Sequence, residues 1–111
     1  MSDFVIKQGD RLPKLRQVLT DGAGAPLDLT GVTGVAFRLR AQRGGALVTL
    51  AGSAAVVAPA ASGVVEYSWG AGDTAAVGAY FGEWVLTYAG LVTRTVPAPG
   101  YVTVEVAPVL P

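Results

Sequence analysis

The chain has 111 residues, of which 51% are hydrophobic and only 14% charged, and its eight basic residues are balanced by eight acidic ones. This composition excludes a disordered chain and predicts one globular domain over residues 1–111, with a lightly charged surface that we expect neighbouring molecules to cover in part. The sequence contains no cysteine and no histidine, which excludes disulfides and thiolate metal sites and removes the commonest general base.

Charge is distributed unevenly along the chain. Residues 1–56 carry seven basic and four acidic residues, a balance of +3, and residues 57–111 carry one basic and four acidic residues, a balance of −3. Opposite charge on the two halves would suit head-to-tail packing of identical copies, and scattered solvated charges are the alternative. Since no basic excess remains overall, we expect no nucleic-acid partner. The start of the chain lacks an apolar run of signal-peptide length, and no segment approaches ~20 apolar residues, so we expect a soluble protein without a secretion signal or membrane contact.

Apolar and polar residues alternate with a period of two, and glycine or proline interrupts the alternation about every ten residues. The pattern predicts strands at 3–7, 12–20, 32–41, 64–69, 80–88, 91–96 and 101–106, with one or two weaker strands within 48–63. Turns are expected at 42–47, 89–90 and 97–100, and 70–79 is a connection with room for one helical turn. Pro13 should put the start of the second strand at an edge or a bend. Without an amphipathic helix, the chain is predicted to be an all-β antiparallel sandwich of seven or eight strands, with a small closed barrel as the alternative.

The stretch TDGAGAPLDLTG, residues 20–31, has the glycine density of a phosphate-binding loop. A dinucleotide or phosphate loop needs a following helix, and the phosphate loop also needs a Lys followed by Ser or Thr. Here a strand-like segment follows Pro26, and no such Lys is present. The stretch is therefore predicted to be a turn between two strands, and no cofactor is expected.

Two outward glutamates, Glu66 and Glu83, could form a catalytic pair if they face each other across a sheet. Isolated outward glutamates are nearly always solvated, so that interpretation is the weaker one. With no catalytic residue, cofactor or metal ligand set indicated, we expect a protein that is not an enzyme and has no small-molecule substrate.

The aromatic residues divide into two sets. The larger set could either form a platform on which sugars stack or pack in the core. The inward positions of its members favour the core; they are Tyr67, Trp69, Tyr80, Trp84 and Tyr88. Phe81 and Val85 share the opposite face of their strand and are predicted to be exposed and to form a protein–protein contact. The outward Arg38 and Arg40 are the candidate charges that set the register of that contact.

The segment GDTAAVGAY, residues 72–80, resembles the corner between strands E and F of immunoglobulin-like domains. In that corner a tyrosine hydroxyl bonds nearby backbone, which would be the structural role of Tyr80 here. Asp73 is predicted to be a turn residue that bonds its own backbone, and Gly78 completes the corner.

The order of FVIKQGDRLPKLRQVLTD, GAPLDLTG, VVEYSWGAGDTAAVGAYFGEWVLTY and PGYVTVEV along the chain resembles the N-terminal domain of baseplate upper proteins of tailed bacteriophages. The resemblance implies an immunoglobulin-like sandwich without catalysis, localised in the virion after synthesis in the host cytoplasm. Its partners would be other virion proteins and copies of itself. Because the sequence ends at VAPVLP, we expect no downstream helical or receptor-adaptor parts, and the protein could equally be a capsid decoration protein or a minor tail protein. A carbohydrate-binding or host-receptor adaptor module is the alternative function.

Overall fold

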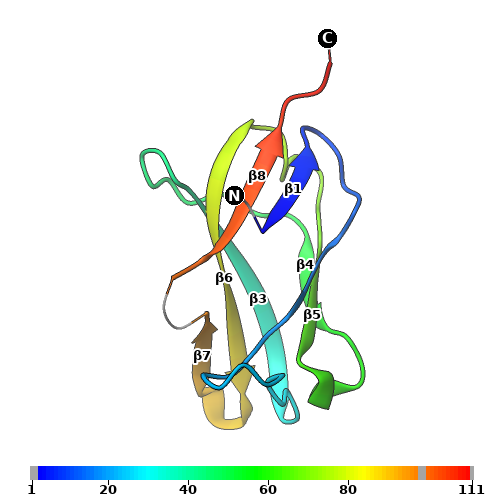
Figure 1. The fold of residues 1–111 in the computed structure, drawn as a ribbon, viewed down its shortest axis with the longest axis vertical. Coiled ribbons are helices and arrows are strands. Elements are labelled where there is room, and N and C mark those ends of the chain that lie inside the picture. The colour runs from blue at the N-terminus through cyan, green and yellow to red at the C-terminus, as the bar shows by residue number, and fades with distance from the viewer. Residues whose placement is uncertain (1–2, 98–99, 111) are drawn as a thin grey trace.

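Eight β-strands follow one another along the part of the chain that the structure, a computed structural model, describes: residues 3–97 and 100–110 (Figure 1). Their bounds are β1 Phe4–Lys7, β2 Leu15–Val18, β3 Val32–Ala41, β4 Ser53–Val56, β5 Val64–Ser68, β6 Gly78–Tyr88, β7 Thr93–Val96 and β8 Val102–Ala107. Two short 3-10 turns, η1 (Ala60–Ser62) and η2 (Ala89–Leu91), are the helical elements of the described residues. The predicted all-β class is confirmed.

The strands form two separate sheets, which makes the molecule a sandwich and not a closed barrel. The larger sheet has the order β1-β8-β6-β3, and β7 also pairs with β6; the smaller sheet has the order β2-β5-β4. β8 pairs with residues 78–82 of β6 and β7 pairs with residues 84–87, so both lie along one edge of β6 like a single interrupted strand. The smaller sheet, with β2, β5 and β4, faces β3, β6 and the interrupted strand made of β7 and β8. This is the strand arrangement of an immunoglobulin-like sandwich.

The sandwich departs from a purely antiparallel one at a single strand pair. β1 and β8 run parallel, with Phe4 beside Val104 and Lys7 beside Ala107, whereas the other strand pairs of the described residues are antiparallel. These two strands lie at opposite ends of the chain, so no short hairpin forces them to be antiparallel. The period-two pattern encodes which face a residue occupies and carries no information about strand direction.

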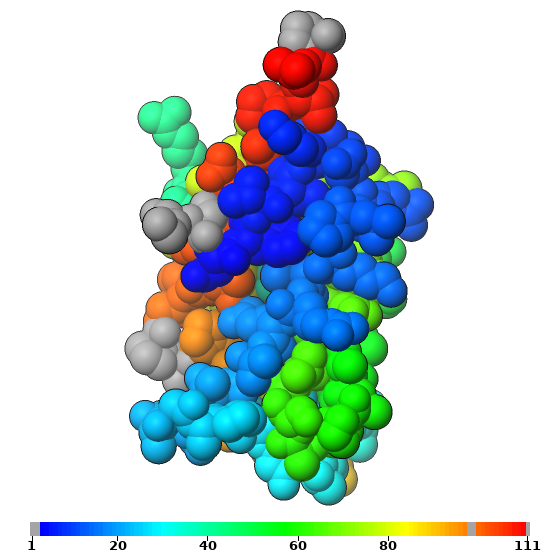
Figure 2. Space-filling model, turned by 45° about the vertical axis from the view of Figure 1, so that its right-hand side comes forward, coloured from blue at the N-terminus to red at the C-terminus, as the bar shows by residue number. Residues whose placement is uncertain are grey.

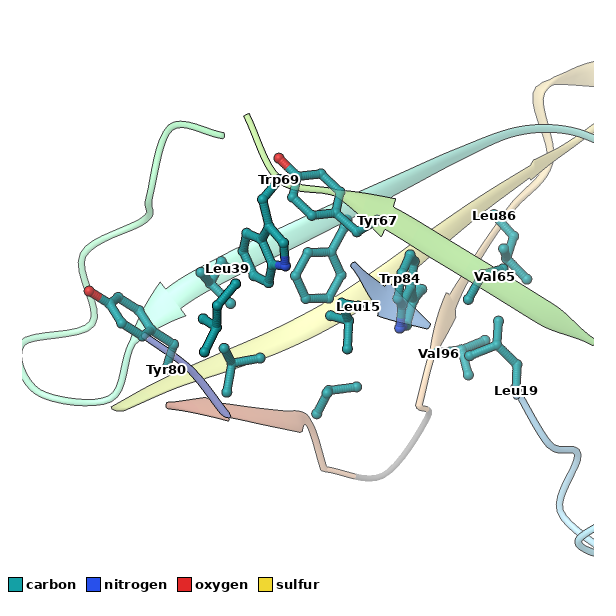
Figure 3. Close-up of a cluster of buried hydrophobic side chains, with 14 of the residues drawn as sticks. Leu15, Leu19, Leu39, Val65, Tyr67, Trp69, Tyr80, Trp84, Leu86 and Val96 are labelled. Atoms are coloured by element: carbon teal, nitrogen blue, oxygen red, sulfur yellow. The ribbon is translucent and has the colours of Figure 1, made fainter. Parts of the chain in front are cut away.

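The core lies between the sheets and is built from alternate residues of both (Figure 3). Phe37 on β3 sits at its centre, with ring centroids 4.6 Å from Trp84 and 5.3 Å from Tyr67. Trp84 is fully buried, and its indole Nε1 donates to Gln17 Oε1 at 2.9 Å. The buried apolar residues are Ile6, Leu15, Leu19, Leu27, Leu29, Phe37, Leu39, Val65, Tyr67, Trp69, Tyr80, Trp84, Leu86, Val96, Val102, Val104 and Val106.

The glycine-rich stretch is a turn, as predicted. Thr20 and Pro26 face each other as an isolated antiparallel bridge, and the Asp21 carboxylate accepts hydrogen bonds from the backbone N–H groups of Ala23 and Ala25. Gly24 adopts a φ of +87°, which residues with a side chain rarely adopt. β3 follows the stretch, where a phosphate loop would need a helix.

Candidate docking surface

The outer face of the larger sheet brings together the four residues predicted to form an interface. The register of β3 against β6 sets Arg40 beside Phe81 and Ala36 beside Val85, and Arg38 lies between them along β3. Residues that alternate with these on both strands belong to the buried core. The four side chains therefore share one surface because neighbouring strands in register keep the same face.

An aromatic and arginine cluster forms the centre of this face. The rings of Phe81 and Tyr101 lie 4.9 Å apart between centroids, and the Arg40 guanidinium carbon lies 5.9 Å from the first ring and 5.3 Å from the second. Phe81 is half-buried, less exposed than expected, because Tyr101 and Arg40 cover part of its ring. Cation–π contacts at such a site contribute about 0.5–1 kcal/mol each and favour the position of the arginine head over the rings.

A groove opens beside this cluster. It encloses a volume of about 200 Å³, which is smaller than the roughly 300–1,000 Å³ typical of small-molecule and cofactor sites. One wall is Leu47, a 74% exposed side chain that pairs across from Arg40 as the chain leaves the 42–47 turn. We call this the outer-face groove, and its lining residues are Arg38, Leu39, Arg40, Leu47, Phe81, Glu83 and Tyr101.

The charges of the outer-face groove are open to a partner. Arg38 lies directly across from Glu83 in the strand register. Within the described residues, ion pairs closer than 4.0 Å link Lys14 and Arg16 to Glu66, and neither Arg38 nor Glu83 takes part in one. The rim of the groove thus offers hydrogen-bond donors and an acceptor beside the aromatic centre.

Below the groove, the rows of Val85 and Thr87 on the same face consist of uncharged residues. Val85 lies between Ala36 on β3 and Thr95 on β7, and Thr87 lies beside Thr93 one row further on. Val85 is half-buried by these neighbours rather than fully exposed. Uncharged and partly apolar residues of this kind suit contact with another protein.

Two residues of the surface were not identified from the sequence. Tyr101 had a usable signal, because the inward positions of Val102, Val104 and Val106 place the preceding residue on the outer face. Leu47 had none, since it lies in a turn and reaches the sheet only through its bridge to Arg40.

The proposed carboxylate pair does not form. Glu66 lies on β5 in the smaller sheet and Glu83 on β6 in the larger sheet, so they cannot be neighbours across one sheet. Glu66 is paired by Arg16, whose Nη2 lies 2.9 Å from Oε2, and by Lys14 at 3.6 Å. The hydrogen bond from Arg16 is the main reason that the pKa of Glu66 is lowered.

The charge imbalance between the two halves of the sequence does not produce two oppositely charged surfaces. Arg16 in the first half binds Glu66 in the second, and Arg38 in the first half lies across from Glu83 in the second. Because β2 pairs with β5 and β3 with β6, the fold interleaves the halves. These pairings give no support to attraction between two oppositely charged halves, and head-to-tail packing of identical copies stays a prediction.

The large aromatic set is not a sugar-stacking platform. Tyr67, Trp69, Tyr80 and Trp84 are at most 7% exposed, and Tyr88 packs against the same core from a half-buried position. Phe81, which is half-buried, and Tyr101, which is 43% exposed, form an aromatic surface on the other side of the larger sheet.

The structural corner precedes β6. The Tyr80 hydroxyl donates to the carbonyl oxygen of Ala76 at 2.6 Å, the contact by which a tyrosine corner holds the chain between the two sheets. Gly78 begins β6 with a φ of +156°, next to the Tyr80 ring. This corner positions β6, the strand that carries the centre of the docking surface.

Asp73 does more than bond its own turn. Its Oδ2 accepts from Gly70 N at 2.7 Å, from the Tyr67 hydroxyl at 2.6 Å and from Gly52 N at 3.2 Å, while Oδ1 accepts from Ala51 N at 2.7 Å. The side chain is buried and joins the corner to residues 51–52, some twenty positions earlier. The sequence indicated the local bond but not the long-range ones.

The environment of Asp73 shifts the pKa of two groups in opposite directions. Burial would raise the pKa of Asp73, but the hydrogen bonds from Tyr67 and the backbone N–H groups of residues 51, 70 and 52 outweigh it and lower the pKa. Burial and the nearby carboxylate raise the pKa of the Tyr67 hydroxyl. The carboxylate therefore stays ionised and the phenol stays protonated, as their short hydrogen bond requires.

No cluster of three or more potential metal ligands occurs among residues 3–97 and 100–110. Over the same residues, the helical elements are too short to span a membrane. Comparison of the chain with protein-family models, with curated proteins and with solved structures gave no match.

Proposed function

We propose that the chain is a non-catalytic structural protein of a tailed-bacteriophage virion, which docks in many copies on a larger assembly through the outer face of its larger sheet. The observation that carries the proposal is the cluster of Arg40, Phe81 and Tyr101 beside the groove. The resemblance of the sequence to baseplate upper proteins suggests the kind of assembly. A small sandwich of this type could be a component of the phage tail or baseplate, or it could be a capsid decoration protein.

The chemistry of the surface supports docking against protein. Tyrosine and arginine are the residue types most enriched among the energetically dominant positions of protein interfaces. Here they stand over a half-buried Phe81 on a rigid sheet, so little conformational entropy is lost when a partner covers them. Arg38 and Glu83 at the rim would fix the register by charge.

Virion purification tests the localisation directly. Particles purified from the phage that encodes the chain should contain it at a fixed ratio to the major capsid protein, in either the head or the tail fraction. Mass spectrometry of the separated fractions gives both the location and the copy number. Absence of the chain from both fractions would refute the proposal.

Rebinding of purified protein tests the surface. Particles lacking the chain should bind added wild-type protein on co-sedimentation, and Phe81→Ala should bind at least tenfold more weakly while remaining folded. Val18→Ala, which trims a 50% exposed side chain on the other sheet, is the matched control and should bind like wild type. Equal binding by wild type and Phe81→Ala would remove the outer face from the proposal.

A carbohydrate-binding or host-receptor adaptor module is the second candidate. It is favoured by the accessible ring of Tyr101, 43% exposed, next to charged Arg38 and Glu83, since sugars stack on aromatic faces and bond charged groups at their edges. A glycan array probed with wild type and with Tyr101→Ala tests it. A signal lost in the variant supports glycan binding, and no signal above background with wild type refutes it.

A further inference from the structure

The segment that follows β8 leaves the sandwich with apolar side chains uncovered. Val109 is 50% exposed and Leu110 is 91% exposed. Figure 1 shows this segment, Pro108–Leu110, running beyond the ends of the strands, and in Figure 2 it stands out from the body in red. Its hydrogen bond to the sandwich is from Lys7 Nζ to the Pro108 carbonyl oxygen at 3.3 Å. We call Pro108–Leu110 the tail of the protein, or in this subsection simply the tail, which is not the tail of a virion.

The outer-face groove has the complementary chemistry. The apolar lining includes Leu47 and Tyr101, which are 74% and 43% exposed, and the half-buried Phe81. Proline has no backbone N–H, so the tail presents more carbonyl acceptors than donors. Arg38 and Arg40 at the groove each carry five N–H donors and no acceptor.

We propose that the tail of one copy lies in the outer-face groove of the next copy, with Leu110 as the apolar anchor and the arginines as donors to the tail carbonyls. This rests on the proposed function, in which copies of the chain repeat in an assembly. Proline-containing extended segments dock in aromatic-lined grooves because they are already extended before binding and lose little entropy. The volume of about 200 Å³ suits one or two aliphatic side chains rather than a larger ligand.

The tail cannot reach the groove of its own copy. The near end of the groove lies level with Thr103, because Arg40, Phe81 and Thr103 occupy one row of the sheet. From there to Ala107, the last residue of β8, the strand rises about 13 Å at ~3.3 Å per residue. Residues 108–110 span at most about 10–11 Å even when fully extended, and they would first have to reverse direction. The contact must therefore join two copies.

A tail-to-groove contact is heterologous, since different surfaces of the two copies meet. Such contacts generate rings when the rotation closes and filaments when it does not. The contact area is small, so we expect weak association in free solution, detectable between ~0.1 and ~1 mM.

Three substitutions of exposed leucines by aspartate test the proposal. Leu110→Asp blocks the tail, Leu47→Asp blocks the groove, and Leu91→Asp alters an 85% exposed leucine that belongs to neither. All three sites are exposed, so the sandwich should remain folded, which thermal melting checks. Sedimentation of the intact chain should show self-association of wild type and Leu91→Asp, and at least tenfold weaker association of Leu110→Asp and Leu47→Asp.

Mixing the two blocked variants is the decisive arm. An equimolar mixture of Leu110→Asp and Leu47→Asp retains one intact tail and one intact groove, so it should form dimers and nothing larger. A mixture that stays monomeric, wild type that is monomeric at ~1 mM, or equal disruption by Leu91→Asp would overturn the inference. Protein that is monomeric yet still co-sediments with particles would leave the proposed function standing, so the two failures are distinguishable.

Discussion

Replacement of Asp73 by Asn tests whether the buried carboxylate holds the corner of the sandwich. The carboxylate accepts four hydrogen bonds, three at Oδ2 and one at Oδ1. An Asn side chain has the same shape but one oxygen, so we expect that oxygen to take the position of Oδ2 and the amide NH₂ to face the backbone N–H of Ala51. Two donors then oppose each other, and one N–H loses its partner.

The expected loss of stability follows from these bonds. An unpaired N–H costs about 1–3 kcal/mol, and hydrogen bonds to a charged acceptor are roughly twice as strong as those to a neutral one. Asp73→Asn should therefore lower the free energy of unfolding by about 2–4 kcal/mol at pH 7, which corresponds to a fall in Tm of about 8–20 °C for a domain of this size.

The pH dependence of that loss has a defined sign. The pKa of Asp73 is lower in the folded chain than its ordinary value of 3.8. Its contribution to stability is fully present above that ordinary value and is lost as the pH falls through the lower, folded value. The difference in stability between wild type and Asp73→Asn should thus be constant above about pH 5 and shrink as the pH falls to 3, by at most about 1 kcal/mol.

Urea unfolding followed by tryptophan fluorescence at pH 7, 5 and 3 measures the difference. Asp10→Asn is the matched control, because the exposed Asp10 is bonded to Thr74 through its backbone carbonyl and not through its carboxylate. This control should change stability by no more than about 0.5 kcal/mol at any pH. A difference for Asp73→Asn below about 0.5 kcal/mol at pH 7, or one that is the same at pH 3, would refute the reasoning.

Four further substitutions test the core, the surface, the corner and the close approach of two backbone segments at Gly70. Trp84→Ala empties a fully buried position and should destabilise the domain by about 3–5 kcal/mol in urea unfolding. Phe81→Ala should leave the domain folded and weaken assembly. The reverse result would contradict the assigned faces of β6. Tyr80→Phe removes the corner hydrogen bond and should cost about 1 kcal/mol, with an unchanged melting temperature as the contrary outcome. Gly70→Ala would place a Cβ 2.5 Å from the backbone carbonyl carbon of Ala51, so it should destabilise the domain by about 1–3 kcal/mol or more. A Tm equal to that of wild type would show that the backbones at Gly70 and Ala51 are not tightly packed.

Local pattern was enough for the assignment of faces. Alternation along residues 80–88 placed Trp84 in the core and Phe81 outside it, and both lie where the pattern put them. The turn at residues 20–31 was equally predictable, because glycine and proline act on the backbone of their own segment. The same alternation would have assigned Tyr101 to the outer face had it been extended one residue before Val102.

Contacts between distant segments could not be predicted in this way. The bonds of Asp73 to residues 51–52 depend on where the loop after β3 meets the corner before β6, and nothing in either segment specifies that meeting. The supposed neighbourhood of Glu66 and Glu83 failed for the same reason, since sheet membership is a property of the whole topology.

The sequence by itself determined the all-β class, the turns, and which side chains point inward, because these depend on a period of two and on residues acting within a few positions of themselves. The tertiary structure alone decided the parallel pairing of β1 with β8, the stacking of Tyr101 on Phe81 under Arg40, and the position of Leu47 at the groove. Each of these joins segments far apart in the chain. Their strand order and register are set by the packing of the two sheets as a whole and are not written in any one segment.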